Sequence, residues 1–401
     1  MSPPTATTPA SPADRSPSTS AGSRRALERL LGIAATEGNR VSVLRNGQEI
    51  FPAMLADIDA AEETIDLCTF VYWTGDVAVA MAESLAERAR AGVRVRVLID
   101  AVGGRDMRPQ LVQRMTDSGA DVRWFRPPTR NPLKIEHRTH RKVLVCDGRI
   151  GYTGGVGIAQ EWQGDGRSPG CWRDTHVRFD GPAVLGLHAG FLRNWVESHP
   201  ATLHELIEDG VAPRVHDDGI PVQVVTGHGS IHDSDVGLAL RALVSSAERT
   251  LNLTTAYFNP ADELAEVIHE AAARGVTVRL LVPGEHIDKR IAAAARDHEL
   301  GPALEAGVRV WRYRPSMLHA KILTVDGQVA AVGSANVNAR SSSRDDELMA
   351  IVHAPEIAEL LDEHLDADMA HADELLLEDW RRRGLVSRVA ETLVAPIRRY
   401  L

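Results

Sequence analysis

The stretch HRKVLVCDGRIGYTGG at His140–Gly155 returns later in the chain as HAKILTVDGQVAAVGS at His319–Ser334. In both copies a lysine follows a histidine by two residues, and an apolar run then leads to an Asp-Gly pair. Asp-Gly between apolar runs is a strong hairpin signal, so each copy predicts a strand, a tight turn and a returning strand. Because residues i and i+2 of a strand share a face, each histidine should project beside its lysine.

The similarity between the two parts of the chain extends upstream of these hairpins. The segment LAERARAGVRVRVLID at Leu85–Asp100 corresponds to IHEAAARGVTVRLLVP at Ile268–Pro283. Each is typical of the end of an amphipathic helix, a glycine stop and an apolar strand. The repeated order predicts an α/β fold of two homologous halves, each a mixed β-sheet flanked by helices. An active site would then lie at the pseudo-two-fold interface between the halves.

We expect five segments along the 401 residues: a disordered Ser/Thr/Pro/Ala-rich tail at 1–22, a first half at 23–205, a turn-rich linker at 206–220, a second half at 221–370 and a C-terminal helical segment at 371–401. The N-terminal stretch lacks the apolar region of a secretory signal, and no run approaches the roughly 18–20 apolar residues that span a bilayer. The cysteines, Cys68, Cys146 and Cys171, suggest neither a disulfide framework nor a zinc site, which fits a cytoplasmic setting.

Lysine is rare in this arginine-using chain, and two of its four lysines, Lys142 and Lys321, stand in the repeated motifs; the others are Lys134 and Lys289. The net charge of −10 argues against a nucleic-acid partner. Basic stretches at 123–142 and 308–321 nevertheless lead into the two motifs, which indicates a local site for an anion such as phosphate. A neutral imidazole can attack phosphorus, a second imidazole can exchange protons with the leaving and entering oxygens, and ammonium groups stabilise the remaining phosphoryl charge.

The two motifs, His-x-Lys-x4-Asp in each half, resemble the double HKD signature of the phospholipase D superfamily. The resemblance is greatest to bacterial cardiolipin synthases and extends from about Val41 to Leu365. Supporting stretches are WRDTHVRFDGPAV at Trp172–Val184, which resembles the synthases specifically, and GSANVNARS at Gly333–Ser341. The resemblance implies a two-step exchange through a phosphohistidine, with no metal and no cofactor.

The resemblance also assigns the residues of the site. The catalytic set implied is His140, Lys142, Asp147, His319, Lys321 and Asp326. Within this set the lysines hold the phosphoryl oxygens, and the two aspartates are expected to fix the turns rather than to carry protons. The supporting residues are Asn336, a further oxygen ligand, Ser334 beside it, and the acids Asp174 and Glu347.

The two histidines are expected to differ in role. We expect His140 to be the nucleophile and His319 the acid and base, with Asp174 orienting His140 and Glu347 orienting His319. Two positions depart from the family pattern. Gly157 stands where relatives often carry Asn, so that oxygen binding would rest on Asn336. Asp345 stands where relatives often carry Asn, two residues before Glu347.

The activity expected is transfer of a phosphatidyl group from one phosphatidylglycerol to another, giving cardiolipin and glycerol. The acceptor is left open between a phosphatidylglycerol, a phosphatidylethanolamine and a small alcohol. The alternatives are a phospholipase D that forms phosphatidic acid, a phosphodiesterase acting on nucleic acid, and a non-catalytic lipid-binding protein. The negative net charge disfavours the phosphodiesterase acting on nucleic acid, and intact motifs in both halves disfavour the non-catalytic protein.

A phospholipid substrate requires contact with a membrane. We expect a monomer attached peripherally to the inner face of the cell membrane. The segment 381–401 carries Leu385, Val389, Leu393 and Ile397 at helical spacing, flanked by arginines. This pattern fits an interfacial amphipathic helix and equally a helix that packs on the protein's own core.

Overall fold

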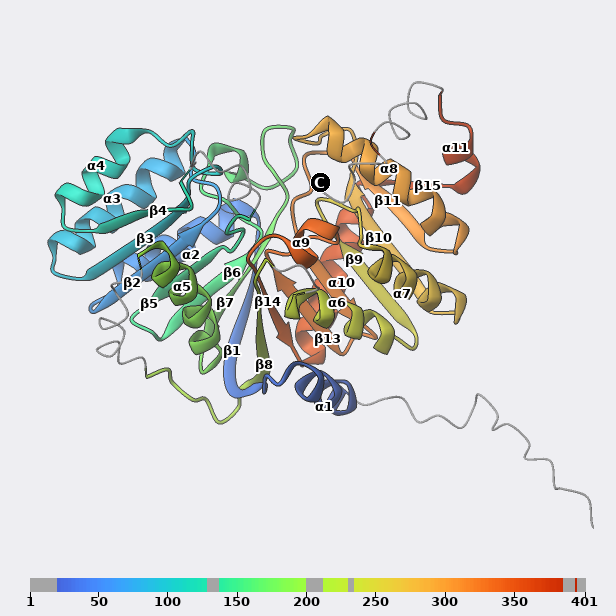
Figure 1. Cartoon of the computed structure of the whole chain (residues 1–401), viewed down its shortest axis with the longest axis horizontal. Coiled ribbons are helices and arrows are strands. Elements are labelled where there is room, and N and C mark those ends of the chain that lie inside the picture. The colour runs from blue at the N-terminus through green and yellow to red at the C-terminus, as the bar shows by residue number, and fades with distance from the viewer. Residues whose placement is uncertain (1–19, 128–136, 200–211, 230–233, 385–393, 395–401) are drawn as a thin grey trace, which may run out of the picture.

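The computed structural model describes residues 20–127, 137–199, 212–229, 234–384 and 394 (Figure 1). Most of the tail predicted at 1–22 lies outside these residues, as do residues 206–211 of the predicted linker and the apolar stripe of the C-terminal segment. Residues Ser20 to Gly22, assigned to the tail, belong to the first helix, α1 (Ser20–Leu31).

Fifteen strands of the described residues form one continuous sheet, in the order β15-β11-β10-β9-β12-β13-β14-β8-β1-β7-β6-β5-β2-β3-β4. The first seven are β1 (Thr36–Arg45), β2 (Thr64–Thr69), β3 (Arg94–Asp100), β4 (Asp121–Phe125), β5 (Val143–Cys146), β6 (Ile150–Gly154) and β7 (Thr175–Asp180). The others are β8 (Ile220–Gly227), β9 (Thr250–Thr254), β10 (Thr277–Pro283), β11 (Arg309–Tyr313), β12 (Ile322–Val325), β13 (Val329–Gly333), β14 (Glu347–Val352) and β15 (Ala372–Leu375).

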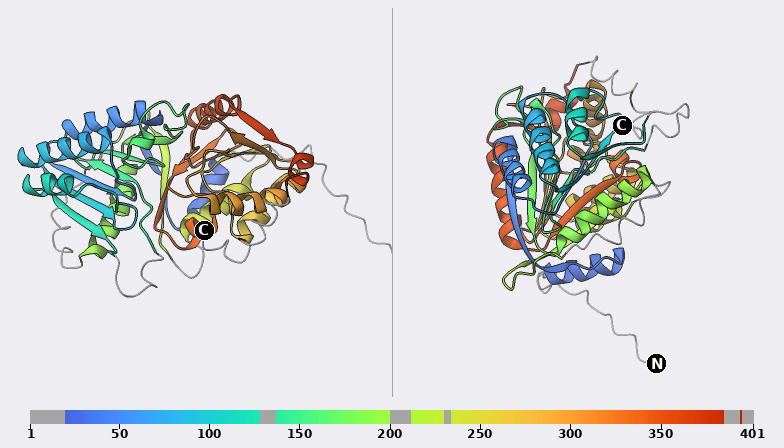
Figure 2. Two further views of the ribbon diagram at one scale, coloured as in Figure 1. Left: turned by 90° about the horizontal axis from the view of Figure 1, so that it is seen from above. Right: turned by 90° about the vertical axis from the view of Figure 1, so that its left-hand side faces the viewer.

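The strand order repeats itself across the middle of the sheet. Counted outward from the central antiparallel pair β1 and β8, the sequence β1-β7-β6-β5-β2-β3-β4 on one side matches β8-β14-β13-β12-β9-β10-β11 on the other. In each half three strands run parallel, and beyond them the two hairpin strands and the following strand each pair antiparallel with their neighbours. The predicted α/β fold of two homologous halves, each with a mixed sheet, is confirmed, and Figure 2 shows the halves side by side.

Helices cover both faces of each half. Those of the first half are α2 (Asn46–Asp59), α3 (Asp76–Arg90), α4 (Pro109–Asp117) and α5 (Ala183–Ser198), with a short 3₁₀ turn η3 (Gln160–Trp162). Those of the second are α6 (Asp235–Ser246), α7 (Asp262–Ala273), α8 (Arg290–Glu305), α9 (Ala339–Ser343), α10 (Pro355–Met369) and α11 (Leu377–Arg381). None of the helices in the described residues is both long and apolar enough to cross a bilayer.

Alternation along the strands explains this layering. Leu67 and Val97 pack in a cluster with α2 and α3, whereas their neighbours Cys68 and Leu98 join a cluster with α5. Successive strand residues face opposite sides, so an apolar residue at every position means that both faces of the sheet are covered. The cluster around α5 also takes in side chains of β12, β13, β14 and α10, and it therefore forms the core between the halves.

The C-terminal region differs from expectation at its start. Residues 372–375, predicted to be helical, form the strand β15, which pairs antiparallel with β11 at the edge of the sheet. The pairing with β11 satisfies backbone groups that an edge strand would leave open, and this tertiary constraint outweighs local helical pattern.

One buried arginine bridges the two halves at the centre of the molecule. Arg141 is fully buried, and its guanidinium donates to the carbonyl oxygens of Gly190 in α5 and Gly227 in β8, each at 2.8 Å. It also donates to Asn194 Oδ1 at 2.5 Å and to the Glu347 carbonyl oxygen at 3.2 Å. The planar fork of one arginine thus satisfies acceptors from both halves.

We predict that Arg141→Met lowers the free energy of unfolding by about 3 kcal/mol, because several buried acceptors lose their donor together. The measurement is urea unfolding followed by fluorescence. Arg40→Met is the matched control, since Arg40 pairs with Asp218 at 3.4 Å where both side chains are largely exposed. That variant should change stability by no more than about 0.5 kcal/mol. Equal losses in the two variants would contradict the bridging role of Arg141.

Candidate active site

The two histidines are brought together by pairing between the halves. Each lies just before the first strand of its hairpin, and the residue preceding it forms an isolated parallel bridge with the other half, Thr139 with Asp346 and Leu318 with Arg173. The backbone N–H of His140 donates to the Asp346 carbonyl at 2.9 Å, and that of His319 donates to the Arg173 carbonyl at 2.7 Å. The two motifs therefore meet at the predicted interface.

This pairing corrects the expected partners of the histidines. Glu347, not Asp174, contacts His140, with the carboxylate oxygens 3.0 and 3.2 Å from Nδ1. Asp174, not Glu347, contacts His319, with Oδ2 2.8 Å from Nδ1. The reason is the register of the bridges. Thr139, just before His140, pairs with Asp346, just before Glu347. Leu318, just before His319, pairs in the same way with Arg173, just before Asp174. Each imidazole is thus oriented by a carboxylate from the opposite half.

The two carboxylates are held by different donors. Glu347 accepts hydrogen bonds from the hydroxyls of Ser334 and Ser341, the latter at 2.6 Å. Asp174 accepts from the indole N–H of Trp162 at 2.8 Å. Sequence reasoning missed Ser341 and Trp162 as parts of the site. One signal in the sequence pointed to a different donor for Asp174. The position of Ser334, which donates to Glu347, is occupied by Gly155 in the first motif, and glycine has no side-chain donor.

Burial and these partners fix the protonation states. Burial lowers the pKa of both His140 and His319 to about 4, so each is a neutral imidazole at pH 7. Burial opposes ionisation of Glu347, but His140, Lys142 and Ser334 outweigh it and lower the pKa of this carboxyl to about 2. The pKa of Asp174 is likewise lowered against its burial, by His319 and Lys321. An ionised carboxylate on Nδ1 keeps the proton there and leaves Nε2 with a free lone pair.

The two motif lysines are buried beside the histidines. Lys142 Nζ donates to the His140 carbonyl oxygen at 2.7 Å. Lys321 Nζ lies 2.9 Å from His319 Nδ1 and also contacts the His319 carbonyl oxygen. Burial lowers the pKa of Lys142 to about 8 and that of Lys321 to about 7. Burial deprives both ammonium groups of hydrating water, so each is stabilised when an anionic ligand binds beside it.

The motif aspartates lie at the far ends of the hairpins. Asp147 accepts hydrogen bonds from the backbone N–H groups of residues 62–64, at the start of β2, and Asp326 accepts from those of residues 248–250, at the start of β9. Both have left-handed backbones, with φ of 51° and 54°. Their contacts are those of turn residues, as expected, and they do not contact the histidines.

A cavity of about 290 Å³ opens beside His140 and is lined by both halves, with Phe70 and Arg138 on one side and Tyr257, Lys289 and Asn336 on the other. The buried carboxamide of Asn336 retains an oxygen without a hydrogen-bond partner among the described residues, so this group can still bind a ligand. At the equivalent Gly157 a Cβ atom would lie 2.7 Å from Val71 Cβ and 3.1 Å from Trp162 Cη2. An asparagine therefore has no room in the first half as it is packed.

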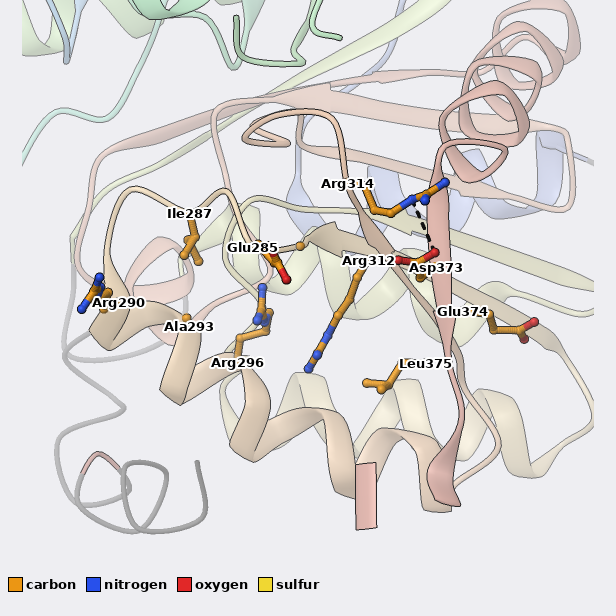
Figure 3. A pocket seen from close by; sticks show the side chains of 11 residues that line it. Glu285, Ile287, Arg290, Ala293, Arg296, Arg312, Arg314, Asp373, Glu374 and Leu375 are labelled. Atoms are coloured by element: carbon orange, nitrogen blue, oxygen red, sulfur yellow. Dashed lines mark ion pairs between the residues drawn. The ribbon is translucent and has the colours of Figure 1, made fainter. Parts of the chain in front are cut away.

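A larger cavity of about 690 Å³ lies in the second half alone (Figure 3). Its lining includes Arg290, Arg296, Arg312 and Arg314 together with Glu285, Asp373 and Glu374. Much of its charge is balanced locally, because Arg296 and Arg312 share Asp297, and Arg314 turns toward Asp373 at 3.4 Å. Neither histidine nor lysine occurs among the described residues that line it. Size does not make it the reaction site, and we assign the chemistry to the smaller cavity.

Comparisons with known proteins agree with this geometry. A family model described as "Cardiolipin synthase, PLD-like domain" matches residues 54–161 and 240–369. Cardiolipin synthase A of Pseudomonas aeruginosa is 33% identical over 93% of this chain and 76% of its own length. The major cardiolipin synthase ClsA of Bacillus subtilis is 30% identical over 90% of this chain and 76% of its own length.

Solved structures show the same fold at low sequence identity. Phosphatidylserine synthase from Haemophilus influenzae Rd KW20 is similar with a TM-score of 0.72 at 14% identity, over 94% of this chain and all of that chain. Polyphosphate kinase from Porphyromonas gingivalis gives a TM-score of 0.56 at 12% identity, over 90% of this chain and 53% of that one. With the family model matched in both halves, the chain belongs to the cardiolipin synthase family of phospholipase D-type phosphatidyltransferases.

Proposed function

We propose that this chain moves a phosphatidyl group from one phosphatidylglycerol to the free glycerol hydroxyl of a second, giving cardiolipin and glycerol. The observation that carries the proposal is the pair of neutral imidazoles, each with Nδ1 bound to a buried carboxylate of the opposite half. A buried lysine lies beside each of them. This arrangement supplies a nucleophile, a proton carrier and two charges for phosphoryl oxygens.

In the first step Nε2 of His140 attacks the phosphorus of the donor lipid. The N–P bond forms and the bond from phosphorus to the glycerol oxygen breaks. His319, which takes up a proton on Nε2 as the anionic donor lipid binds, gives this proton to that oxygen. Glycerol leaves, and the phosphatidyl group remains on His140. In the second step neutral His319 takes the proton of the acceptor hydroxyl, whose oxygen attacks phosphorus as the N–P bond breaks. His140 is restored, and His319 is again protonated.

The exposure of the two imidazoles supports this division of roles. The His140 side chain is 13% exposed and lines the cavity, whereas that of His319 is 7% exposed and does not. A nucleophile must reach the phosphorus directly. His319 packs against the rings of Trp162 and Trp172, at centroid distances of 5.1 and 5.4 Å, and these apolar neighbours limit the access of water to the proton carrier.

Lys142, Lys321 and Asn336 are proposed to bind the phosphoryl oxygens. Ser334 and Ser341 would act through Glu347, and Trp162 through Asp174, as positioning residues. Asp147 and Asp326 are proposed to act only through the hairpin turns. The scheme requires no metal and no cofactor.

We further propose that the two homologous halves, 23–205 and 221–370, work as a single unit in a monomer. The enzyme would act while attached peripherally to the inner face of the cell membrane, where its phospholipid substrates lie. The arginine-flanked segment 381–401 is a candidate for that attachment.

The test of the activity follows lipid products from phosphatidylglycerol vesicles. Wild-type protein should form cardiolipin and one glycerol for each cardiolipin. His140→Ala and His319→Ala should each lower the rate by about 10³-fold or more, because one removes the nucleophile and the other the proton carrier. His269→Ala, on α7, is the matched control and should retain the wild-type rate. Phosphatidic acid as the sole product would establish a hydrolase instead.

The pH dependence of kcat/KM should report the pKa values of the essential groups in the free enzyme. On the acid side, kcat/KM should fall as the pH drops through about 4, where the buried His140 with its lowered pKa becomes protonated. Above about 4 it should fall about tenfold per pH unit, because His319, the pKa of which burial also lowers to about 4, must be protonated to act as the acid of the first step. Above about 7 the fall should become steeper, because burial makes Lys321, in contact with His319, lose its proton there. Glycerol release measured between pH 3.5 and 9.5 gives both limbs.

Lys321→Arg provides the control for the steeper fall above about pH 7. An arginine stays protonated throughout this range, so in the residual activity the steeper fall should begin near pH 8, the value to which burial lowers the pKa of Lys142. A steeper fall that still begins near pH 7 in this variant would contradict the assignment to Lys321.

A further inference from the structure

A third lysine lies at the cavity that contains His140. Lys289 immediately precedes α8 and lines this cavity together with His140 and Asn336. It is one of only four lysines in the chain, and two of the others carry the repeated motifs. The proposed transfer assigns no role to it.

The charge of Lys289 is not balanced within the cavity. Of the other cations that line it, Arg340 makes two hydrogen bonds to Asp345, at 2.7 and 2.9 Å, and Arg138 lies 3.5 Å from Asp100. His140 is neutral at pH 7. Among the residues that the structure describes, exposed Lys289 forms no ion pair. It therefore leaves a net positive charge at the mouth of the cavity.

An aromatic ring positions this charge relative to the reacting groups. Lys289 Nζ lies 5.7 Å from the ring centroid of Tyr257, a cation–π distance. The Tyr257 hydroxyl donates to Asp288 at 2.7 Å, and its ring meets that of His319 edge to face at 6.5 Å. One side chain, Tyr257, thus separates the ammonium of Lys289 from the imidazole of His319.

The chemistry of the second step calls for a cation at such a place. The acceptor phosphatidylglycerol carries its own phosphate anion, one glycerol unit away from the hydroxyl that attacks. This anion must approach a phosphohistidine whose phosphoryl group is itself anionic, and Lys142 and Lys321 are already committed to that group. Water and simple alcohols bring no such charge, so only a phospholipid acceptor needs a further cation.

We infer that Lys289 binds the phosphate of the acceptor phospholipid, which makes this part of the cavity an acceptor subsite selective for an anionic lipid. The inference rests on the proposed phosphatidyl transfer. It assigns to Lys289 a role in acceptor choice and none in formation of the phosphohistidine.

Competition between two acceptors tests this role. Phosphatidylglycerol is presented in micelles of a neutral detergent with a fixed concentration of ethanol, and the ratio of cardiolipin to phosphatidylethanol is measured. Both products arise from the same phosphohistidine, so the ratio reports the acceptor step alone. Lys289→Ala should lower the ratio about tenfold, the effect of one lost charge contact at an exposed site. Lys289→Arg, which keeps the charge, should restore most of it.

Arg290→Ala is the matched control. Arg290 is the next residue and also exposed, but it lines the larger, arginine-lined cavity (Figure 3) and not the cavity of His140. The ratio should be unchanged in this variant. An equal fall in Lys289→Ala and Arg290→Ala would show a general effect of surface charge and overturn the inference, as would an unchanged ratio in Lys289→Ala.

The outcome for the wild-type protein separates this inference from the proposed function. Phosphatidylethanol without cardiolipin would show that the phosphohistidine forms but does not pass its phosphatidyl group to an anionic lipid, which overturns both cardiolipin formation and the acceptor subsite. Absence of both products would overturn the proposed transfer itself. Formation of both with an unchanged ratio in Lys289→Ala would leave the transfer standing and remove the role of Lys289.

Discussion

Two backbone hydrogen bonds across the interface determine the active centre, from His140 N–H to the Asp346 carbonyl and from His319 N–H to the Arg173 carbonyl. Each places a histidine of one half next to a carboxylate of the other. Because the orienting acid always comes from the opposite half, neither half alone contains a complete imidazole–carboxylate pair. Buried Arg141, which bonds to acceptors of both halves, holds the same interface at its core. Folding of the interface and assembly of the site are therefore one event.

Within this symmetric frame the two sides have diverged. Two hydroxyls hold Glu347, whereas an indole N–H holds Asp174. Asn336 keeps hydrogen-bonding capacity in the second half, whereas Gly157 is packed against Val71 and Trp162 in the first. A two-step transfer requires one imidazole to hold the phosphorus and the other to carry the proton. We propose that the cavity next to His140 and the aromatic neighbours of His319 correspond to these two roles.

Much of this was predictable from the sequence because the information was local or repeated. Period-two spacing placed each lysine beside its histidine, the Asp-Gly pairs marked the turns, and the duplication indicated two halves. The carboxylate partners were predicted wrongly, because residues 207 and 145 positions apart are joined by single bridges that leave no periodic trace. The strand β15 was missed for a similar reason, since it depends on pairing with β11. The scarcity of lysine was a further local signal, and it directed attention to Lys142 and Lys321.

The charges of the centre explain why it should react only when substrate is bound. With both histidines neutral, the positive charges of Lys142 and Lys321 are balanced by the negative charges of Glu347 and Asp174, all four being buried. A buried phosphodiester adds one negative charge to this balanced set. Its field favours a positive imidazolium, so the pKa of His319 should rise as the donor lipid binds. The substrate thus recruits the proton that the leaving glycerol requires. The acceptor lipid then brings a second anion, which the four buried charges cannot neutralise, and a cation at the cavity mouth becomes necessary.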